Sequence, residues 1–375
     1  MFRKSVAIPC AVAAILGAAG SGVALAGVPA PTVGGKIFAD LTNIDQKNNG
    51  TDTAASGTGV DVKRFYLIFN EKFNDTWSAK MVTDASYNSG QQVDVYMKNA
   101  FLQATLSRAF WVRLGEANLP WIPFDEGVYG YRYVENTLID RLHFGTSADW
   151  GLHVGGQLTD LGAGMLSYRL SAVNGAGYKN PTRTKSMDVE GRLTYRLDGV
   201  ILAVGGYEGK LGQDKYGQDV TIAGLSTPQR FRTASRFDAL AGWAGEGLRV
   251  TFEYFSANDW NNVPEYKATG AVNPSDKADG YALYASYDID PMWSVFGRYD
   301  RAKLSQDLAP SLKDNYFDVG LQASPIKNVQ VALVYKHEKM DGGPVGGFFP
   351  TTNGSAFNEA DGTYNEVGIW TQVAF

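Results

Sequence analysis

Apolar and polar side chains alternate along most of the sequence after residue 26, in segments of about ten residues. The clearest segment ends the chain. In 363–375, Val367, Ile369 and Phe375 share one face, and Glu366 lies on the other. Successive side chains of a β-strand point to opposite faces, so each segment is predicted to be a strand with one apolar face. No stretch of about 18 apolar residues follows residue 26, so no membrane-spanning helix is predicted.

The alternation recurs often enough to build a large sheet. We expect sixteen strands, with one pair more or fewer left open, approximately at 35–44, 61–71, 77–87, 93–105, 109–117, 150–158, 165–173, 187–197, 200–209, 233–243, 248–256, 279–288, 292–301, 314–322, 328–339 and 363–375. Every second connection is short, such as 198–199, whereas the others are mostly long, such as 210–232. Short periplasmic turns that alternate with longer extracellular loops are typical of transmembrane β-barrels.

The connection 118–149 is unusual for an extracellular loop because it carries many aromatic residues, Trp121 and Tyr131 among them. An alternative division treats 139–146 as a further strand, but it gives an odd strand count and disrupts the alternation of turns. We therefore assign 118–149 to the third extracellular loop and expect it to fold inward, rather than to form an ordinary surface or trimer contact. The charged residues expected to border the resulting constriction are Asp125, Glu126, Arg132, Glu135 and Arg141.

Strands can span a membrane only as a closed barrel, because every backbone N–H and C=O group must be paired in hydrocarbon. An eight-stranded barrel fills its interior with side chains, whereas one of about sixteen strands leaves a water-filled lumen. The predicted fold is therefore an all-β transmembrane antiparallel β-barrel of about 16 strands, with the third extracellular loop folded inward.

The N-terminus has the features of a secretory signal peptide. Arg3 and Lys4 precede an apolar run at 6–17, and small residues lead to an A-x-A cleavage site that ends at Ala26. A transmembrane anchor is the alternative, but the run is short and no stop-transfer charges follow it. We therefore divide the chain into a signal peptide, 1–26, and a barrel domain, 27–375, exported to the outer membrane of a Gram-negative cell.

The same alternation sorts the charged residues, because charge is costly on the lipid face of a barrel. The residues predicted to face the lumen are Arg64, Lys80, Arg113, Arg169, Arg192, Arg196, Arg249, Arg298 and Lys336. Two interpretations remain open. In the first, a wall of both signs keeps the pore hydrated, with Glu190, Glu253 and Asp300 among the acidic residues. In the second, the arginines form an anion pathway, as rings of Arg or Lys do in anion-selective pores.

Composition and motifs exclude several other functions. Removing Arg3 and Lys4 from the 34 basic residues leaves 32 against 39 acidic residues, so nucleic-acid binding is not suggested. No phosphate-binding loop and no Cys–His spacing suited to zinc or haem is present, so we expect no cofactor and no enzymatic activity. His153 with a serine such as Ser167 could suggest a hydrolase, but no acidic partner or nucleophile elbow supports it.

Three stretches form a set of motifs: Arg113-Leu114-Gly115 running into Pro120-x-x-Pro-x-x-x-Glu126, the stretch 149–154, and the stretch 166–175. Over about a third of the chain they resemble the phosphate-selective porin family, porin O and porin P. The terminal Phe375 likewise resembles the assembly signal of outer-membrane proteins. The family resemblance implies a 16-stranded homotrimer with an inward third loop, a ladder of arginines and a lysine cluster near the mouth. Isolated arginines of this chain, rather than the whole ladder, match that pattern.

The sequence thus predicts a passive porin, a water-filled channel for small hydrophilic solutes and ions. One alternative is a channel selective for phosphate or other anions. A second is a non-conducting barrel that serves as an adhesin or structural protein. The expected partners are outer-membrane lipid and lipopolysaccharide, the permeating solutes, and further copies of the chain in a homotrimer.

Overall fold

The structure is a computed structural model that describes residues 30–87, 93–161, 164–222, 224–265, 274–345 and 361–375. The predicted signal peptide, 1–26, lies outside the described residues.

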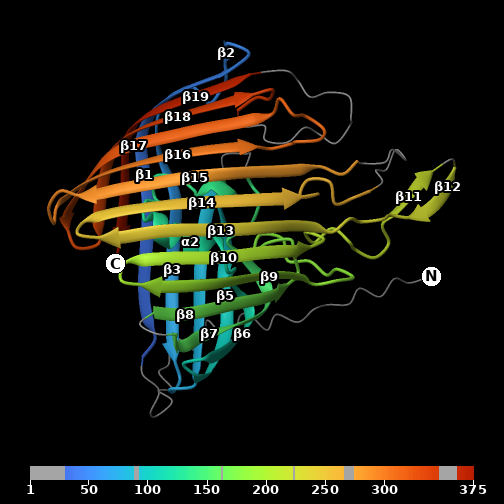
Figure 1. Cartoon of the computed structure of the whole chain (residues 1–375), viewed down its shortest axis with the longest axis horizontal. Coiled ribbons are helices and arrows are strands. Elements are labelled where there is room, and N and C mark those ends of the chain that lie inside the picture. Colours follow the sequence, from blue (N-terminus) through green and yellow to red (C-terminus); the bar gives the residue numbers. More distant parts are fainter. Residues whose placement is uncertain (1–29, 88–92, 162–163, 223, 266–273, 346–360) are drawn as a thin grey trace, which may run out of the picture.

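Sixteen strands form one closed antiparallel barrel (Figure 1). They are β1 (Thr32–Asn48), β3 (Gly57–Lys72), β4 (Trp77–Tyr87), β5 (Val93–Ser107), β6 (Phe110–Asn118), β7 (Ala148–Leu161), β8 (Gly164–Val173), β9 (Asp188–Leu197), β10 (Val200–Gly209), β13 (Ala234–Gly245), β14 (Leu248–Asn258), β15 (Lys277–Asp288), β16 (Trp293–Lys303), β17 (Lys313–Ile326), β18 (Val329–Asp341) and β19 (Gly362–Ala374). The barrel closes where β1 pairs with β19, from Lys36 opposite Ala374 to Asn48 opposite Gly362. The predicted fold class and strand number are confirmed.

Three short strands lie outside this ring. The strand β2 (Thr51–Asp52) pairs with the end of β1. The strands β11 (Asp219–Ile222) and β12 (Leu225–Pro228) form a hairpin that stands away from the barrel wall in Figure 1. The hairpin belongs to the long connection between β10 and β13, as expected for the side of the barrel that carries the long loops.

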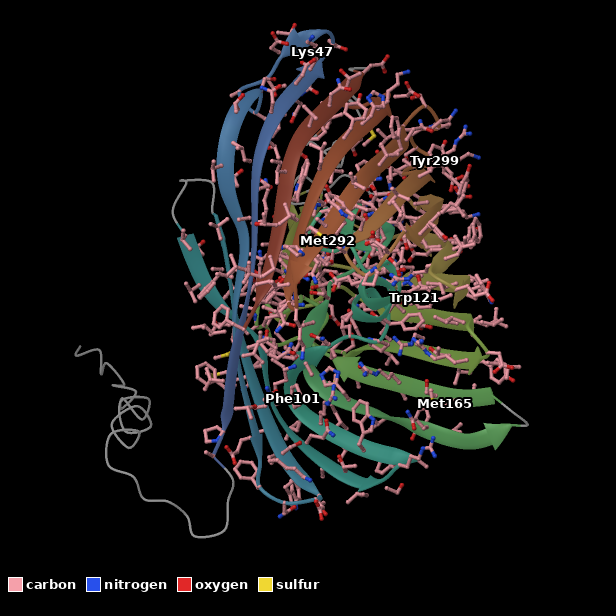
Figure 2. All side chains as sticks on the ribbon, turned by 90° about the vertical axis from the view of Figure 1, so that its left-hand side faces the viewer. Lys47, Phe101, Trp121, Met165, Met292 and Tyr299 are labelled. Carbon is pink, nitrogen blue, oxygen red and sulfur yellow. The ribbon has the colours of Figure 1, made fainter. Side chains whose placement is uncertain are left out.

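Side chains on the barrel strands alternate between the outer surface and the interior, and sticks cover both surfaces of the wall in Figure 2. On β14, Val250 and Phe252 are exposed on the outer surface, whereas Thr251 and Glu253 are buried inside. The outer surface is therefore apolar and the inner surface polar, which is the arrangement required of strands that face lipid on one side only.

Exposed aromatic side chains gather beside the short turns. Each of four such residues lies within three residues of a short turn and points outward: Trp77, Phe110, Trp243 and Trp293. Aromatic rings placed at one level around a barrel mark the boundary between hydrocarbon and water.

The connection between β6 and β7 contains two helices, α2 (Ile122–Tyr129) and α3 (Leu138–Arg141). Pro123 occupies the first turn of α2, where its missing N–H costs nothing, and Gly130 ends the helix in a left-handed conformation. The segment 139–146 forms no strand, in agreement with its assignment to a loop. Among the described residues, no helix has the length and apolar character needed to span a membrane.

Candidate functional site: the inner loop and the lumen wall

The loop 119–147, called the inner loop below, forms the apolar core of the molecule. Trp121, Ile122, Leu138, Ile139 and Phe144 are almost completely buried. A barrel of this size cannot fill its interior with side chains from its own strands. The inner loop supplies that filling, and in Figure 1 its helix α2 is seen through the strands of the wall.

Trp121 attaches the start of the inner loop to two strands. Its backbone N–H donates to Oε1 of Glu190 on β9 at 2.8 Å, and its indole N–H donates to Oε1 of Glu253 on β14 at 2.9 Å. The hydroxyl of Tyr284 donates to the other oxygen of Glu253 at 2.7 Å. Since both carboxylates are buried, these hydrogen bonds satisfy groups that would otherwise be costly to remove from water.

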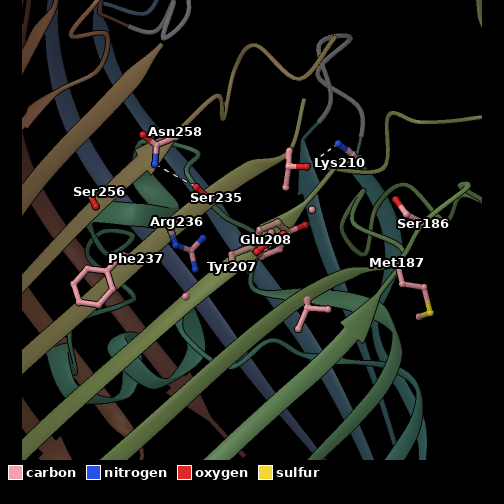
Figure 3. Close-up of a pocket in the computed structure, with 14 residues that line it drawn as sticks. Ser186, Met187, Tyr207, Glu208, Lys210, Ser235, Arg236, Phe237, Ser256 and Asn258 are labelled. Atoms are coloured by element: carbon pink, nitrogen blue, oxygen red, sulfur yellow. Dashed lines mark hydrogen bonds between the residues drawn. The ribbon is translucent and has the colours of Figure 1, made fainter. Parts of the chain in front are cut away.

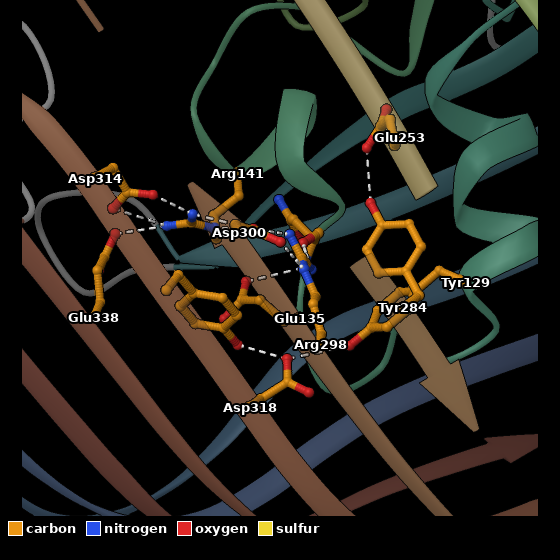
Figure 4. A network of polar contacts seen from close by, with 12 residues as sticks. Tyr129, Glu135, Arg141, Glu253, Tyr284, Arg298, Asp300, Asp314, Asp318 and Glu338 are labelled. Carbon is orange, nitrogen blue, oxygen red and sulfur yellow. Dashed lines mark hydrogen bonds and ion pairs between the residues drawn. The ribbon is translucent and has the colours of Figure 1, made fainter. Parts of the chain in front are cut away.

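Arg141 attaches the end of the inner loop to three more strands (Figure 4). Its guanidinium lies 3.1 Å from Asp300 on β16, 2.5 Å from Asp314 on β17 and 2.6 Å from Glu338 on β18. The ring of Tyr316 packs against the guanidinium, with 4.4 Å from its centroid to Cζ. Several well-oriented charge-assisted hydrogen bonds are the condition under which a buried ion cluster holds its geometry.

Two cations of the wall hold the middle of the inner loop. Arg298 on β16 donates to the carbonyl of Asn136 and pairs with Asp300 at 2.5 Å. Lys336 on β18 donates to the carbonyl of Val134 at 2.8 Å and pairs with Glu135 at 3.2 Å. Both side chains are buried, so they face the loop rather than water.

Tyrosines of the inner loop complete the attachment. Tyr131 stacks on Phe296 with 3.9 Å between ring centroids, and the Tyr133 hydroxyl donates to Gln322 at 2.7 Å. The Tyr129 hydroxyl donates to Asp318 at 3.3 Å. The inner loop is thus fixed along β16–β18 by rings as well as by charges.

The surroundings of the loop carboxyls set their charge. Burial would raise the pKa of Glu135, but Lys336, the Asn136 N–H and nearby arginines lower it to about 2, so this residue is ionised. Burial, followed by repulsion from Glu253, raises the pKa of Asp125 well above its ordinary value. Glu135 therefore contributes a charge to the attachment, whereas Asp125 favours its neutral form.

The opposite side of the lumen is the wall that the inner loop leaves uncovered except at Arg192, which donates to the carbonyl of Pro120. Its inward cations are Lys36 on β1, Arg64 on β3, Lys80 on β4, Lys98 on β5, Arg113 on β6, Arg169 on β8, and Arg192 and Arg196 on β9. Among the described residues, Arg64 alone of these eight has a carboxylate within salt-bridge distance, Asp84 at 3.2 Å. This set is called the basic wall below.

Three arginines of the basic wall lie close together. Arg169 and Arg192 are direct cross-strand partners on β8 and β9, and Arg113 is close enough to Arg169 for the two charges to repel. Aromatic rings cover their guanidinium groups: Trp111 lies 4.3 Å from Arg113, and Phe124 of the inner loop lies 4.0 Å from Arg192. Like charges directly opposite each other destabilise a sheet, so this row is an arrangement that stability alone does not explain.

Most of the buried carboxylates lie on the side of the barrel that the inner loop contacts. The buried carboxylates that face it or lie beside its anchors are Glu190, Asp238, Glu253, Asp300, Asp314, Asp318, Glu338 and Glu366. These eight belong to β9 and β13–β19, whereas four further buried carboxylates, Asp40, Asp84, Glu116 and Asp149, belong to β1, β4, β6 and β7, within the part of the barrel that carries the basic wall. On the loop itself, Glu126 and Asp140 remain partly exposed, and both pair with Arg132. The strands of the basic wall therefore carry more inward cations than buried carboxylates.

Solved structures share this architecture at low sequence identity. The outer-membrane channel DcaP of Acinetobacter baumannii matches with a TM-score of 0.60 at 12% identity, covering 94% of this chain and 99% of that one. An anion-selective porin from Comamonas acidovorans matches with a TM-score of 0.57 at 13% identity, covering 92% and 99%. OmpF of Salmonella typhi matches with a TM-score of 0.55 at 14% identity, covering 92% and 97%. The chain has the porin fold. No family model and no curated protein matches the sequence.

Within this porin fold, the predicted site residues fall into two groups. Arg64, Lys80, Arg113, Arg169 and Arg196 lie on the basic wall, and Glu126 and Arg132 lie partly exposed on the loop. Arg192 lies on the basic wall too, but it is buried and donates to the carbonyl of Pro120 in the inner loop. Asp125, Glu135, Arg141, Arg249, Arg298 and Lys336 instead attach the inner loop to the wall. Their charges are used in loop contacts, because a barrel with a folded-in loop must compensate the polar groups that the loop covers.

Sequence analysis missed two cations of the basic wall, Lys36 and Lys98. The alternation on β1 would have placed Lys36 inward, beside Phe38. Lys98 lies at an irregularity of the ladder, where Asn99 pairs with Val82 and Met97 pairs with Thr83, so residue 98 has no partner on β4. This β-bulge turns Lys98 inward, where it lies over the ring of Tyr66 at 5.1 Å.

The described residues contain no cluster of three or more His, Cys, Asp or Glu side chains that could hold a metal ion. His153 is buried, and its Nδ1 lies 2.8 Å from the hydroxyl of Ser171 rather than beside Ser167. Ser167, the example that the sequence offered, is opposite Gln157 in the register of β7 and β8, whereas Ser171 is opposite His153.

Proposed function

We propose that this protein is a passive outer-membrane porin whose lumen favours anions. In this proposal residues 1–26 are a cleaved signal peptide, and residues 27–375 form the barrel, inserted in the outer membrane of a Gram-negative cell. Solutes pass between the basic wall and the inner loop without a cofactor, so the lumen charge and the free cross-section decide what passes.

The unequal distribution of charges around the inner loop carries this proposal. A lumen wall of both signs would select weakly, but most of the buried carboxylates lie on β9 and β13–β19 beside the loop and its anchors, and four, Asp40, Asp84, Glu116 and Asp149, lie on β1, β4, β6 and β7. Seven of the eight inward cations of the basic wall have no carboxylate within salt-bridge distance among the described residues, as Lys36 and Arg169 illustrate. Rows of Arg and Lys side chains that line a pore select anions.

Phosphate selectivity is a second candidate, which the family resemblance implies. The supporting observation is the row Arg113, Arg169 and Arg192, which crosses neighbouring strands β6–β9. A guanidinium group can donate two parallel hydrogen bonds to the oxygens of one phosphate. Binding of phosphate in the lumen, seen as a reduced chloride current, would distinguish this candidate from a general preference for anions.

A homotrimer is the proposed assembly. The solved trimer form of OmpT, an outer-membrane protein of Vibrio cholerae, matches this chain with a TM-score of 0.52 at 12% identity, covering 92% of this chain and 100% of that one. Conductance steps in groups of three would support the assembly.

The deciding experiment is reconstitution of the purified protein in a planar bilayer, with reversal potentials measured across a potassium chloride gradient. A reversal potential of the sign expected for chloride permeation supports an anion-preferring porin. A potential of the opposite sign contradicts the role of the basic wall. If the protein does not conduct, an adhesin or a structural barrel becomes the better interpretation. If the non-conducting protein hydrolyses ester substrates, it is an enzyme.

Phosphate is then added to both chambers at increasing concentration. A drop in chloride current at millimolar phosphate would support the phosphate candidate. An unchanged current would leave general anion preference as the better description.

A further inference from the structure

The outer surface of β9, β10, β13 and β14 contains a depression that the function of the lumen does not use. Its floor consists of small residues at outward positions. Gly191 and Gly206 are cross-strand partners on β9 and β10, and Ala239 lies one outward level below on β13. Two glycines side by side leave no Cβ on this part of the surface. Other outward positions at mid-height of the barrel carry residues such as Leu333 or Val319.

The lower part of the depression is apolar. A cavity of about 440 Å³ is lined on this surface by Leu193, Leu202, Val204, Ala239 and Phe252, among other residues. It lies within the apolar belt of the barrel, so its natural occupant is hydrocarbon.

The upper part, toward the long loops, is polar (Figure 3). A cavity of about 750 Å³ there has Phe237 on its lower side, whereas Met187 lies at its upper end, just before β9 and beside Ser186. Hydroxyl and amide groups of Ser186, Ser235 and Asn258 lie around it, and the Asn258 amide donates to the Ser235 hydroxyl at 3.2 Å. Lys210 also lines this cavity. The change from apolar to hydroxyl-rich lining follows the depth at which a lipid changes from acyl chain to head group.

The two cavities are parts of one groove. On β10, Val204 lines the lower cavity and Gly206, the next outward residue, lines the upper one. On β13, Ala239 lines the lower cavity and Phe237, the next outward residue, lines the upper one. The floor of the groove spans about two strands, and neighbouring strands of a sheet lie about 4.8 Å apart. A groove of this width admits an acyl chain. It is too narrow for the convex wall of another barrel.

We propose that this groove binds a glycolipid of the outer leaflet, with an acyl chain over Gly191 and Gly206 and its saccharide head among the hydroxyl and amide groups above. The ligand class is a lipid A-type amphiphile. The proposal rests on the outer-membrane placement of the barrel, although it concerns the lipid-facing surface and not the pore.

The test uses a matched pair of glycine substitutions. Gly191→Leu fills the floor, and an added Cβ there meets nothing closer than 3.5 Å, so the strand accepts it. Gly297→Leu is the control: Gly297 lies between the exposed Val295 and Tyr299 on β16, and an added Cβ meets nothing closer than 3.4 Å. Full-length protein purified in mild detergent is titrated with lipid A and analysed by native mass spectrometry.

Gly191→Leu should lower lipid A affinity about tenfold, because loss of roughly two methylene contacts suffices for that change. Gly297→Leu should bind as the unsubstituted protein does. Equal binding by all three proteins would overturn the proposal. So would a change in oligomeric state on Gly191→Leu with unchanged lipid binding, since the groove would then belong to a protein interface.

A second variant tests the head-group site. The double substitution Ser235→Ala with Asn258→Ala should weaken lipid A and leave a diacyl phosphatidylethanolamine unaffected. Equal effects on both lipids would overturn the assignment to a glycolipid. Conductance of every variant is recorded in parallel. If the wild-type protein does not conduct, the proposed porin function is wrong. If it conducts normally but its lipid binding is not selective, only the proposed glycolipid site is wrong.

Discussion

Arg141 and Asp314 lie 2.5 Å apart, Nη2 to Oδ2, although 173 residues separate them in the sequence. Their contact joins the end of the inner loop to β17, and the same guanidinium also reaches β16 and β18. The position of the loop across the lumen therefore depends in part on this one side chain, which three strands share. The free cross-section of the channel depends on the same contact.

Substitution Arg141→Ala should release the end of the inner loop. It leaves three buried carboxylates without their shared cation, and breaking such a buried cluster costs about 3–5 kcal/mol. We expect larger and noisier single-channel conductance and a lower unfolding temperature. The control is Arg301→Ala, which removes an exposed arginine from β16 that has no ion pair among the described residues. If Arg141→Ala conducts with the same step size and noise as wild type, the loop is held elsewhere.

Glu135 should make the attachment of the loop sensitive to acid. Its pKa falls from an ordinary 4.5 to about 2 in the folded protein, because Lys336 and neighbouring donors outweigh the effect of burial. A lowered carboxyl pKa stabilises the fold above the ordinary value, and this stability is lost as the pH falls from about 4.5 toward 2. Channel noise recorded over this range should rise in the wild type.

The variant Glu135→Gln is the control for this effect. It removes the titrating carboxyl and preserves its shape, so noise should already be raised at neutral pH and should change little on acidification. An acid transition that persists unchanged in the variant would assign the effect to another group.

How far the sequence predicts this molecule depends on the range of the interactions. Period-two alternation is local, so it predicted sixteen strands and placed Arg192 inside and Leu193 outside. The fate of each inward charge depends on contacts between distant segments. Arg298 and Arg169 look alike in sequence, yet Arg298 is covered by the inner loop and Arg169 is not. Only the folded position of residues 119–147 separates them.

Local irregularities limit the prediction as well. A strict alternation places Lys98 with the outward residue Leu102, and a single unpaired position in the ladder reverses this. Bulges have no reliable signal in a single sequence, because they depend on the partner strand. Strict alternation therefore leaves Lys98 out of the predicted lumen cations.

Gly205 tests the contact between Trp121 and the wall. This glycine faces inward on β10, and an added Cβ would lie 2.6 Å from the indole of Trp121. Gly205→Ala should displace the indole from Glu253, and overpacking of this kind costs about 1–3 kcal/mol. We expect a lower unfolding temperature and faster cleavage of the inner loop by trypsin. Gly191→Ala, on the outer surface of β9, should change neither, and equal effects of both variants would contradict the inward position of Trp121.

The pair Arg169 and Arg192 decides whether the basic wall sets the selectivity. The double substitution Arg169→Gln with Arg192→Gln removes two adjacent inward charges and preserves polar side chains of similar reach. A charge at about 4 Å in water is worth about 1 kcal/mol, so each loss should lower the chloride-to-potassium permeability ratio about fivefold. Reversal potentials measured in a potassium chloride gradient give this ratio. Arg108→Gln, in an exposed turn outside the lumen, should leave it unchanged. If the double variant retains the wild-type ratio, the selectivity of the channel arises from other residues and the proposed role of the arginine row is wrong.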